Sequence, residues 1–301
     1  MSSDISTPAG GGVDIEIKKK NRWPWIAGAV VAVVAIVGGV VYANTSNEDK
    51  PFGTNLKVAT WSTDIAAENL LQYISDEVAP DHGITIERVQ IDNLVEINRA
   101  VDAGTVAGNF FEHQPFLNDA IAANGFELTL AAPTFTWDQA TYSNQYRSWD
   151  ELPDGAQIAL RDDPAGQAIA LLDLAEAGQI TLKPGKDTIE GLPQLGDIDT
   201  NPKNYQFVQV PIGQLARSLE DVDAVVVHIS DVYAAGLTED QILARHPAPK
   251  GSEGGLVVSN KHLEDPNVQK LIETFEDPKI AEFLETTDNP LIRDTLGPIG
   301  G

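Results

Sequence analysis

The chain has 301 residues, 42% of them hydrophobic, which is enough apolar surface to build two folded lobes or domains. Its formal charge of −25 repels nucleic acids and anionic lipid headgroups, so nucleic-acid binding is not expected. It contains no cysteine, which excludes disulfides, cysteine nucleophiles, thiolate metal sites and a lipidated N-terminal cysteine.

An uncharged, mostly apolar run occupies residues 23–43, and its 21 residues are enough to span a bilayer as a helix. Lysine and arginine precede it, so the positive-inside rule predicts that residues 1–22 stay in the cytoplasm and the rest lies outside. We therefore predict a single-pass membrane protein with an extracytoplasmic main domain. The alternative is a cleaved signal peptide, which exports the same residues. Residues 44–55 are predicted to be a polar, flexible linker.

After the linker, short apolar strands alternate with amphipathic helical segments. The periodicity predicts strands at residues 56–60, 84–91, 127–132, 134–142, 157–160, 205–210, 224–229 and 255–259. It predicts helices at residues 64–78, 94–103, 115–123 and 165–177. This alternation predicts an α/β fold with mainly parallel sheets flanked by helices. We expect two lobes, one made of residues 56–135 and 230–301 and the other of residues 136–229.

A cleft between two such lobes is a natural ligand site, because ligands of open α/β sheets bind at the carboxyl ends of the strands. The sequence contains no nucleophile elbow, zinc-protease helix, P-loop or dinucleotide-binding glycine motif. Its carboxylates are numerous but scattered, so no acid–base pair stands out. No enzymatic activity and no cofactor are predicted.

The segment 109–117, NFFEHQPFL, has the pattern N-x-F-x-H-x-P-F-L. Further short motifs follow in order: TF at 134–135, YS at 142–143, DP at 163–164, NPKN at 201–204 and RSL at 217–219. Each motif is weak alone, but together they extend over roughly residues 55–290. On these motifs the chain resembles the MetQ/NlpA family, the solute-binding proteins of methionine importers.

The resemblance implies a two-lobed, periplasmic-binding-protein-like (type II) fold that works with the permease and ATPase subunits of an ABC importer. It implies that the ligand is an amino acid, methionine or a related one. It also implies that Phe111, His113 and Phe116 form an aromatic slot, where a thioether is attracted to ring edges. On the residues alone, the two phenylalanines are typical of an ordinary core. A metal at Glu112, His113 and Asp119 is not expected, because no second histidine lies at ligand spacing.

The chain departs from the family where the family binds the ligand's charged groups. The family holds the carboxylate with an asparagine and an arginine in a D-P-x-N-x-x-R segment, and here Gly166 and Ile169 stand in their places. His228 takes the place of an asparagine that binds the ammonium group. A bidentate arginine–carboxylate pair is a strong contact, so either another residue replaces it or the ligand differs. Arg161 is the nearest candidate; its alternative is a solvent-exposed arginine paired with a neighbouring aspartate.

Two further residues are candidates for the ligand site. Trp61 follows the first strand and either caps the ligand or shields the end of the sheet. Gln167, near the start of a predicted helix, either donates its amide to the ligand or lies at the surface. The first functional hypothesis is therefore a membrane-anchored receptor that closes around a solute. The second is a surface interaction protein of the same fold that has lost or changed its ligand, for example to a methionine-containing peptide.

Overall fold

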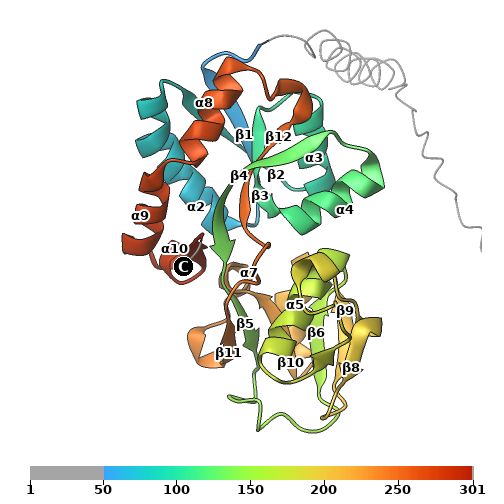
Figure 1. Ribbon diagram of the computed structural model, residues 1–301. Coiled ribbons are helices and arrows are strands. Elements are labelled where there is room, and N and C mark those ends of the chain that lie inside the picture. Colours follow the sequence, from blue (N-terminus) through green and yellow to red (C-terminus); the bar gives the residue numbers. More distant parts are fainter. Residues whose placement is uncertain (1–50, 300–301) are drawn as a thin grey trace, which may run out of the picture. The chain divides into compact units, whose positions relative to one another are not determined.

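The computed structural model describes residues 51–299, except for the side chains of residues 233 and 234, and these residues belong to one compact unit. A six-stranded sheet with the order β13-β4-β12-β3-β1-β2 organises the first lobe (Figure 1). Its strands are β1 (Asn55–Trp61), β2 (Thr85–Ile91), β3 (Gly108–His113), β4 (Leu128–Trp137), β12 (Gly254–Ser259) and β13 (Leu296–Pro298).

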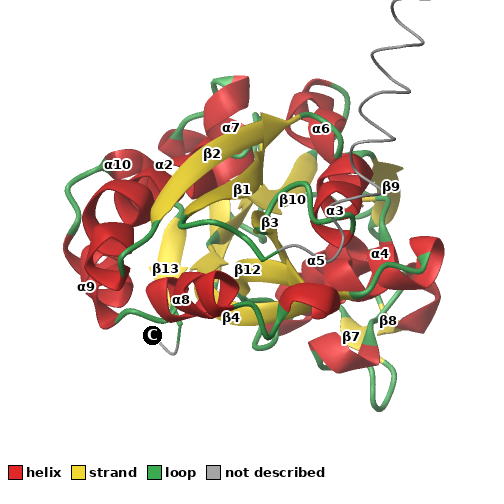
Figure 2. Cartoon of the chain, turned by 90° about the horizontal axis from the view of Figure 1, so that it is seen from above, coloured by secondary structure: helices red, strands yellow, loops and turns green. Residues whose placement is uncertain are grey.

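Helices cover both faces of this sheet, because its central strands are apolar on both sides (Figures 1 and 2). One face carries α2 (Ile65–Tyr73), α8 (Pro266–Phe275), α9 (Pro278–Thr286) and α10 (Pro290–Arg293). The other face carries α3 (Leu94–Asp102) and α4 (Gln114–Asn124). Successive residues of a strand point to opposite faces, so Phe110 lies in the first core and Phe111 in the second.

A five-stranded sheet with the order β11-β5-β10-β6-β9 organises the second lobe. Its strands are β5 (Gln139–Tyr142), β6 (Gln157–Arg161), β9 (Gln206–Val210), β10 (Ala224–His228) and β11 (Ile242–His246), and a ribbon of β7 (Thr181–Leu182) and β8 (Ile198–Thr200) lies apart. Helix α5 (Pro164–Glu176) packs on one face of the sheet. Helices α6 (Ile212–Leu215) and α7 (Ile229–Ala235) pack on the other face.

The chain crosses between the two sheets at two places within residues 51–299. The first crossing is Asp138, which separates β4 from β5. Its backbone N–H donates to the Thr295 carbonyl at 2.8 Å, and its carbonyl accepts from the Ile229 N–H at 3.0 Å. The second crossing is the segment 247–253, between β11 and β12. The backbone of Asp138 is therefore held by both lobes at once.

Both sheets are mixed, so the expectation of mainly parallel sheets is wrong in this detail. β1 pairs in parallel with β2 and β3, and β6 pairs in parallel with β9 and β10. The antiparallel pairs involve the strands that carry the chain between lobes, namely β4, β5, β11 and β12, together with the short β13. Because β11 pairs in the second sheet, the return to the first lobe comes after residue 246, not at residue 230 as predicted.

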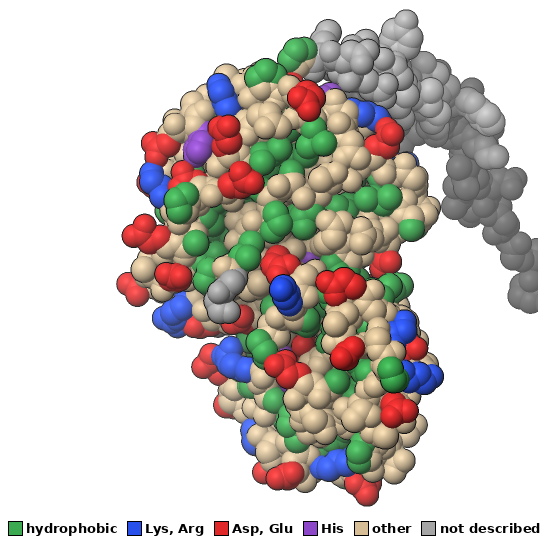
Figure 3. All heavy atoms as spheres, in the orientation of Figure 1, with side chains coloured by type: hydrophobic (Ala, Val, Ile, Leu, Met, Phe, Trp, Pro, Cys, Tyr) green, Lys and Arg blue, Asp and Glu red, His purple; other side chains and the backbone are tan. Residues whose placement is uncertain are grey.

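The end of the predicted linker is fastened to the first lobe. The Phe52 N–H donates to Asp265 Oδ2 at 2.6 Å, and Asn267 Nδ2 donates to the Phe52 carbonyl at 2.7 Å. The predicted cytoplasmic tail, residues 1–22, and transmembrane helix, residues 23–43, lie outside the described residues. Between residues 51 and 299 no helix is both long and apolar enough to cross a bilayer. Figure 3 shows acidic side chains scattered over both lobes, in keeping with the charge of −25.

Candidate functional site

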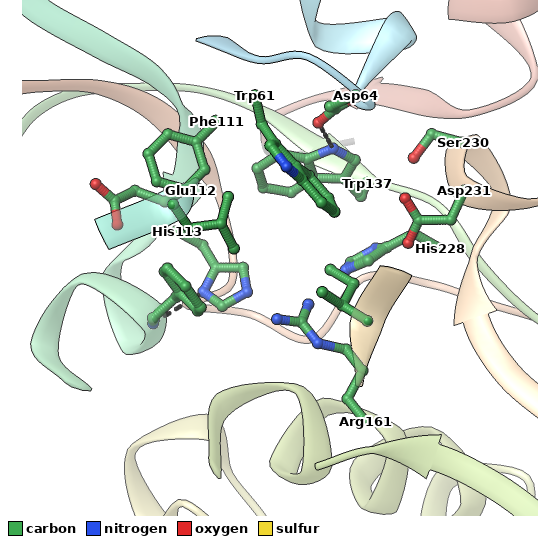
Figure 4. A pocket seen from close by; sticks show the side chains of 13 residues that line it. Trp61, Asp64, Phe111, Glu112, His113, Trp137, Arg161, His228, Ser230 and Asp231 are labelled. Atoms are coloured by element: carbon green, nitrogen blue, oxygen red, sulfur yellow. Dashed lines mark hydrogen bonds between the residues drawn. The ribbon is translucent and has the colours of Figure 1, made fainter. Parts of the chain in front are cut away.

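A pocket of about 410 Å³ lies where the carboxyl ends of strands from both sheets meet (Figure 4). In the first lobe β1 and β3 end here, with Trp61 and His113. In the second lobe β6 and β10 end here, with Arg161 and His228. The walls are formed by Trp61, Asp64, Leu94, Phe111, Glu112, His113, Phe116, Trp137, Arg161, Ile212, His228, Ser230 and Asp231.

Aromatic rings of the first lobe form one side of the pocket. Phe111 is 7% exposed and meets Phe116 edge-on, with 6.1 Å between ring centroids. Trp61 is held by its Nε1, which donates to the Asp92 carbonyl at 3.3 Å. These rings have packing partners on one side and the pocket on the other, so they offer edges and faces to an apolar or thioether group.

Trp137 forms a further part of the wall at the point where the chain leaves the first sheet. Its Nε1 donates to Asp64 Oδ2 at 3.1 Å, and its ring lies 6.0 Å from that of His113 and 5.6 Å from that of His228. Position 254 must be a glycine here, because a Cβ would lie 2.4 Å from the Trp137 ring. Trp137 therefore touches residues from both lobes, and it combines packing with a place in the pocket wall.

His113 is both a wall residue and the N-terminal cap of α4. Its Nδ1 accepts from the Phe116 N–H at 3.2 Å, and Pro115 follows in the first turn, where its missing N–H costs no hydrogen bond. Burial, assisted by the nearby positive charge of Arg161, lowers the pKa of His113 to about 3. The ring is therefore neutral at pH 7, with its proton on Nε2, which leaves that nitrogen as a donor.

Arg161 is buried at the end of β6, with 7% of its surface exposed, and its guanidinium points into the pocket (Figure 4). Its Nε donates to Asp163 Oδ2 at 2.6 Å, while Asp163 Oδ1 accepts from the Gly166 N–H at 2.8 Å and caps α5. Within residues 51–299, its two Nη groups have no hydrogen-bond partner. The guanidinium also lies 5.9 Å from the centre of the Phe116 ring. The predicted alternative, an exposed arginine, is wrong, although the predicted pairing with an aspartate is present.

Gly166 makes room for this arginine. A Cβ at position 166 would lie 2.2 Å from Nε and 2.6 Å from Cβ of Arg161. An asparagine at position 166 and Arg161 in its present place are therefore mutually exclusive. Ile169, at the other departure from the family pattern, is buried against Ile189 and does not line the pocket.

Polar atoms without partners gather on the opposite wall, at the end of β10 and the start of α7. His228 Nδ1, Ser230 Oγ and Asp231 Oδ2 are buried and have no hydrogen-bond partner within residues 51–299. Burial raises the pKa of Asp231 to about 7, and the negative charge of Asp64 adds to the shift while Arg161 opposes it. Burial also lowers the pKa of His228 well below its usual value, so this ring is neutral.

Glu112 reaches the pocket from a buried network behind β3. It accepts from Asn98 Nδ2 at 3.1 Å and from Asn109 Nδ2 at 2.9 Å. Burial raises the pKa of this carboxyl to about 7, and the two amide donors oppose the shift. Glu112 is thus held by two amides, and its charge is poised to change near neutral pH.

The structure brings six of the seven predicted site residues to one pocket: Trp61, Phe111, His113, Phe116, Arg161 and His228. Gln167 does not line it, because its Oε1 accepts from the Leu195 N–H at 2.7 Å and its side chain is buried in the second lobe. Sequence reasoning allowed Trp137 at the border of the cleft but favoured hinge packing for it. It missed, as parts of the pocket wall, Asp64, Leu94, Glu112, Ile212, Ser230 and Asp231. Most of the missed residues lie just after a strand, which was the one available signal, whereas Glu112 lies within β3.

Two sheets, two crossings and a pocket at the carboxyl ends of strands from both lobes define the class of two-lobed solute-binding proteins. The NlpA lipoprotein family matches residues 56–292, and the chain belongs to that family.

The relatives span nearly the same length as the described part of the chain. The D-methionine-binding lipoprotein MetQ of Escherichia coli K12 is 34% identical over 250 residues, which cover 81% of this chain and 89% of that protein. The structure of a nutrient-binding protein from Burkholderia cenocepacia bound to methionine matches with a TM-score of 0.71 and 27% identity, covering 81% of this chain and 99% of that one. Lipoprotein Tp32 from Treponema pallidum matches with a TM-score of 0.69 and 26% identity, covering 81% and 98%.

Proposed function

We propose that this chain is the extracytoplasmic solute-binding protein of an ABC importer and that it binds methionine or a closely related amino acid between its lobes. The names of its relatives, D-methionine-binding lipoproteins, support the ligand class. The observation that carries the proposal is the pocket itself, which joins an aromatic wall to a buried guanidinium whose two Nη groups have no partner among the described residues.

In this proposal the ligand's carboxylate meets the Nη groups of Arg161, in place of the family's arginine at the position of Ile169. A guanidinium and a carboxylate form charge-assisted hydrogen bonds, which are strong in a buried site. The ligand's side chain lies along Phe111 and Phe116, with His113 as a donor at the edge of the slot. His228 lies near the ammonium group.

We also propose that residues 23–43 anchor the protein and that the lobes close around the solute by bending at the two crossings. The anchor suits a chain of 301 residues without cysteine, since a lipidated cysteine is not available in it. The permease and ATPase subunits of an importer are the proposed partners. Closure is expected because the walls of the pocket come from both lobes. A ligand contacts both walls only in the closed state, so its binding stabilises that state.

Thermal unfolding in the presence of each of the 20 amino acids and of short methionine peptides tests this function. A ligand at about 100 times its Kd adds about 2.7 kcal/mol to the free energy of unfolding, so a true ligand raises the Tm visibly. Phe111→Ala is expected to abolish the shift, whereas Phe207→Ala, outside the pocket, is expected to keep it. If no amino acid stabilises the full-length chain, the proposal is wrong.

A second candidate is a surface interaction protein that has lost its solute. Gly166 and Ile169 favour it, because the family's two carboxylate-binding residues are absent. The screen separates the two candidates: stabilisation by a methionine peptide but by no free amino acid indicates a changed ligand, and no stabilisation at all indicates an interaction protein.

A further inference from the structure

Three neighbouring polar atoms in the second lobe are buried and have no hydrogen-bond partner in the part of the chain that the structure describes, and all belong to pocket residues. They are His228 Nδ1, Ser230 Oγ and Asp231 Oδ2, with His228 9% and Ser230 3% exposed. A buried polar atom without a partner costs about 1–3 kcal/mol, and folded proteins seldom leave three together. Such a cluster in a pocket wall indicates a ligand group that supplies the missing hydrogen bonds.

The charges around this cluster decide which kind of group it is. Asp231 faces Asp64 from the turn before α2, while Arg161 reaches into the pocket from β6 and is already paired with Asp163. Glu112 adds a third carboxyl on the wall from β3. The two histidines of the pocket are neutral, because burial lowers their pKa values below pH 7. The pocket therefore contains more carboxyl groups than cations, and its unsatisfied corner attracts a cation with N–H donors.

We propose that Asp231 and Ser230 bind the ammonium group of the ligand and that this binding expels a proton from Asp231 to the solvent. The inference rests on the proposed function and goes beyond it, since it assigns the ammonium to a carboxylate in addition to His228 and couples binding to pH. Asp231 Oδ2 and Ser230 Oγ accept N–H bonds from the ammonium, and His228 Nδ1, when it carries no proton, accepts a third.

The pH dependence follows from the state of Asp231 without ligand. Its pKa is raised to about 7, so below that pH the group is mostly protonated and neutral. An ammonium favours the ionised carboxylate and lowers its pKa, so binding below neutral pH must displace the proton. Affinity is then expected to fall by up to about tenfold for each pH unit below 7 and to level off above it.

The experiment is calorimetric titration of the full-length chain with three probes: L-methionine, methioninol, which lacks the carboxylate, and 4-(methylthio)butanoate, which lacks the ammonium. Titrations in buffers of different ionisation enthalpy, at about pH 6 and about pH 8, count the protons released. Asp231→Asn is expected to weaken L-methionine and methioninol about 10- to 100-fold, to leave the butanoate unaffected and to end proton release. Asp173→Asn, a buried carboxyl outside the pocket, is the matched control and is expected to change nothing.

Glu112→Gln is the second variant, because Glu112 also has a pKa raised to about 7 and lines the pocket. If proton release survives in Glu112→Gln and is lost in Asp231→Asn, the proton belongs to Asp231. If the wild type binds L-methionine and Asp231→Asn binds it equally well with the same pH dependence, the inference is wrong while the proposed function stands. If none of the three probes binds the wild type and no amino acid stabilises it in the thermal screen, the proposed function fails and the inference with it.

Discussion

At the scale of single residues, the position of Arg161 depends on the absence of a side chain at Gly166. Gly166 has no side chain, and this is what allows Arg161 to lie beneath the N-terminus of α5. Asp163 holds the arginine through one oxygen and caps the helix through the other. The small residue at position 166 and the buried arginine at position 161 are thus structurally coupled.

Replacement of Gly166 by asparagine tests this coupling. Gly166→Asn is expected to destabilise the protein by about 1–3 kcal/mol, because the new Cβ collides with Arg161 close to its backbone and not only at its flexible end. In the background of Arg161→Gly, which also removes the Cβ that the new side chain meets, the same substitution is expected to cost much less. Denaturant unfolding of the four proteins measures the coupling, and equal costs in both backgrounds would show that the two residues are independent.

Arg161→Gln tests the role of the guanidinium in binding. Loss of a charge-assisted pair with a carboxylate is expected to weaken L-methionine about 10- to 100-fold, as measured by calorimetry. Methioninol, which lacks the carboxylate, is expected to lose little affinity. Arg217→Gln, an exposed arginine outside the pocket, serves as the control. An unchanged Kd for methionine in Arg161→Gln would remove Arg161 from the site.

Among the elements of the fold, strand β3 shows how burial changes the protonation of a residue in the pocket wall. All six of its residues are buried, and it delivers Phe111 and His113 to the pocket while Glu112 is tied to Asn98 and Asn109 behind it. The pKa of Glu112 is about 7 in the folded protein and near 4.5 in the unfolded chain. Between these values the folded state keeps a proton that the unfolded state has lost, so stability falls as the pH rises.

Glu112→Gln is expected to remove this fall of the free energy of unfolding with rising pH. The wild type should lose up to about 3 kcal/mol of unfolding free energy from this group between pH 4.5 and 8, whereas the amide is neutral throughout. Urea unfolding at several pH values, with Asp231→Asn examined in parallel, assigns the slope to one carboxyl or the other. A variant with the same pH dependence as the wild type would mean that Glu112 is ionised in the folded protein.

The sequence predicted the elements better than their pairing. Strands β1, β2, β6 and β10 and helices α3 and α5 have clear periodicity and lie close to their predicted bounds. Strand β3 was not identified as an element, because residues buried on both faces show no alternation. The antiparallel partners of β4 and β12 depend on contacts between distant segments, which local patterns do not encode.

The site could be predicted only in part, because some of its residues are close together in the sequence and others are brought together only by the fold. Phe111, His113 and Phe116 lie within one short motif, so the sequence places them together. Asp64 and Asp231 are far apart in the chain, and each looks like one acidic residue among 45. Only the fold brings them to one pocket. Gln167 lies near the start of a helix, as predicted, but it does not reach the pocket. Its amide oxygen accepts a hydrogen bond from the Leu195 N–H instead.

At the scale of the whole molecule, the described residues consist of two lobes joined at Asp138 and at residues 247–253. Each lobe has its own core, so the lobes are expected to move as rigid bodies about these crossings. Small-angle scattering of the full-length chain with and without L-methionine is expected to show a smaller radius of gyration with ligand. An unchanged radius with saturating ligand would mean that binding requires no closure.

Intrinsic tryptophan fluorescence tests the central claim most directly, because Trp61 and Trp137 both line the pocket. Titration of the full-length chain with L-methionine should give a saturable change in emission that is reduced in Trp61→Phe and needs far more ligand in Arg161→Gln. The account is contradicted if methionine gives no saturable change in the wild type, or if Arg161→Gln responds at the same concentrations.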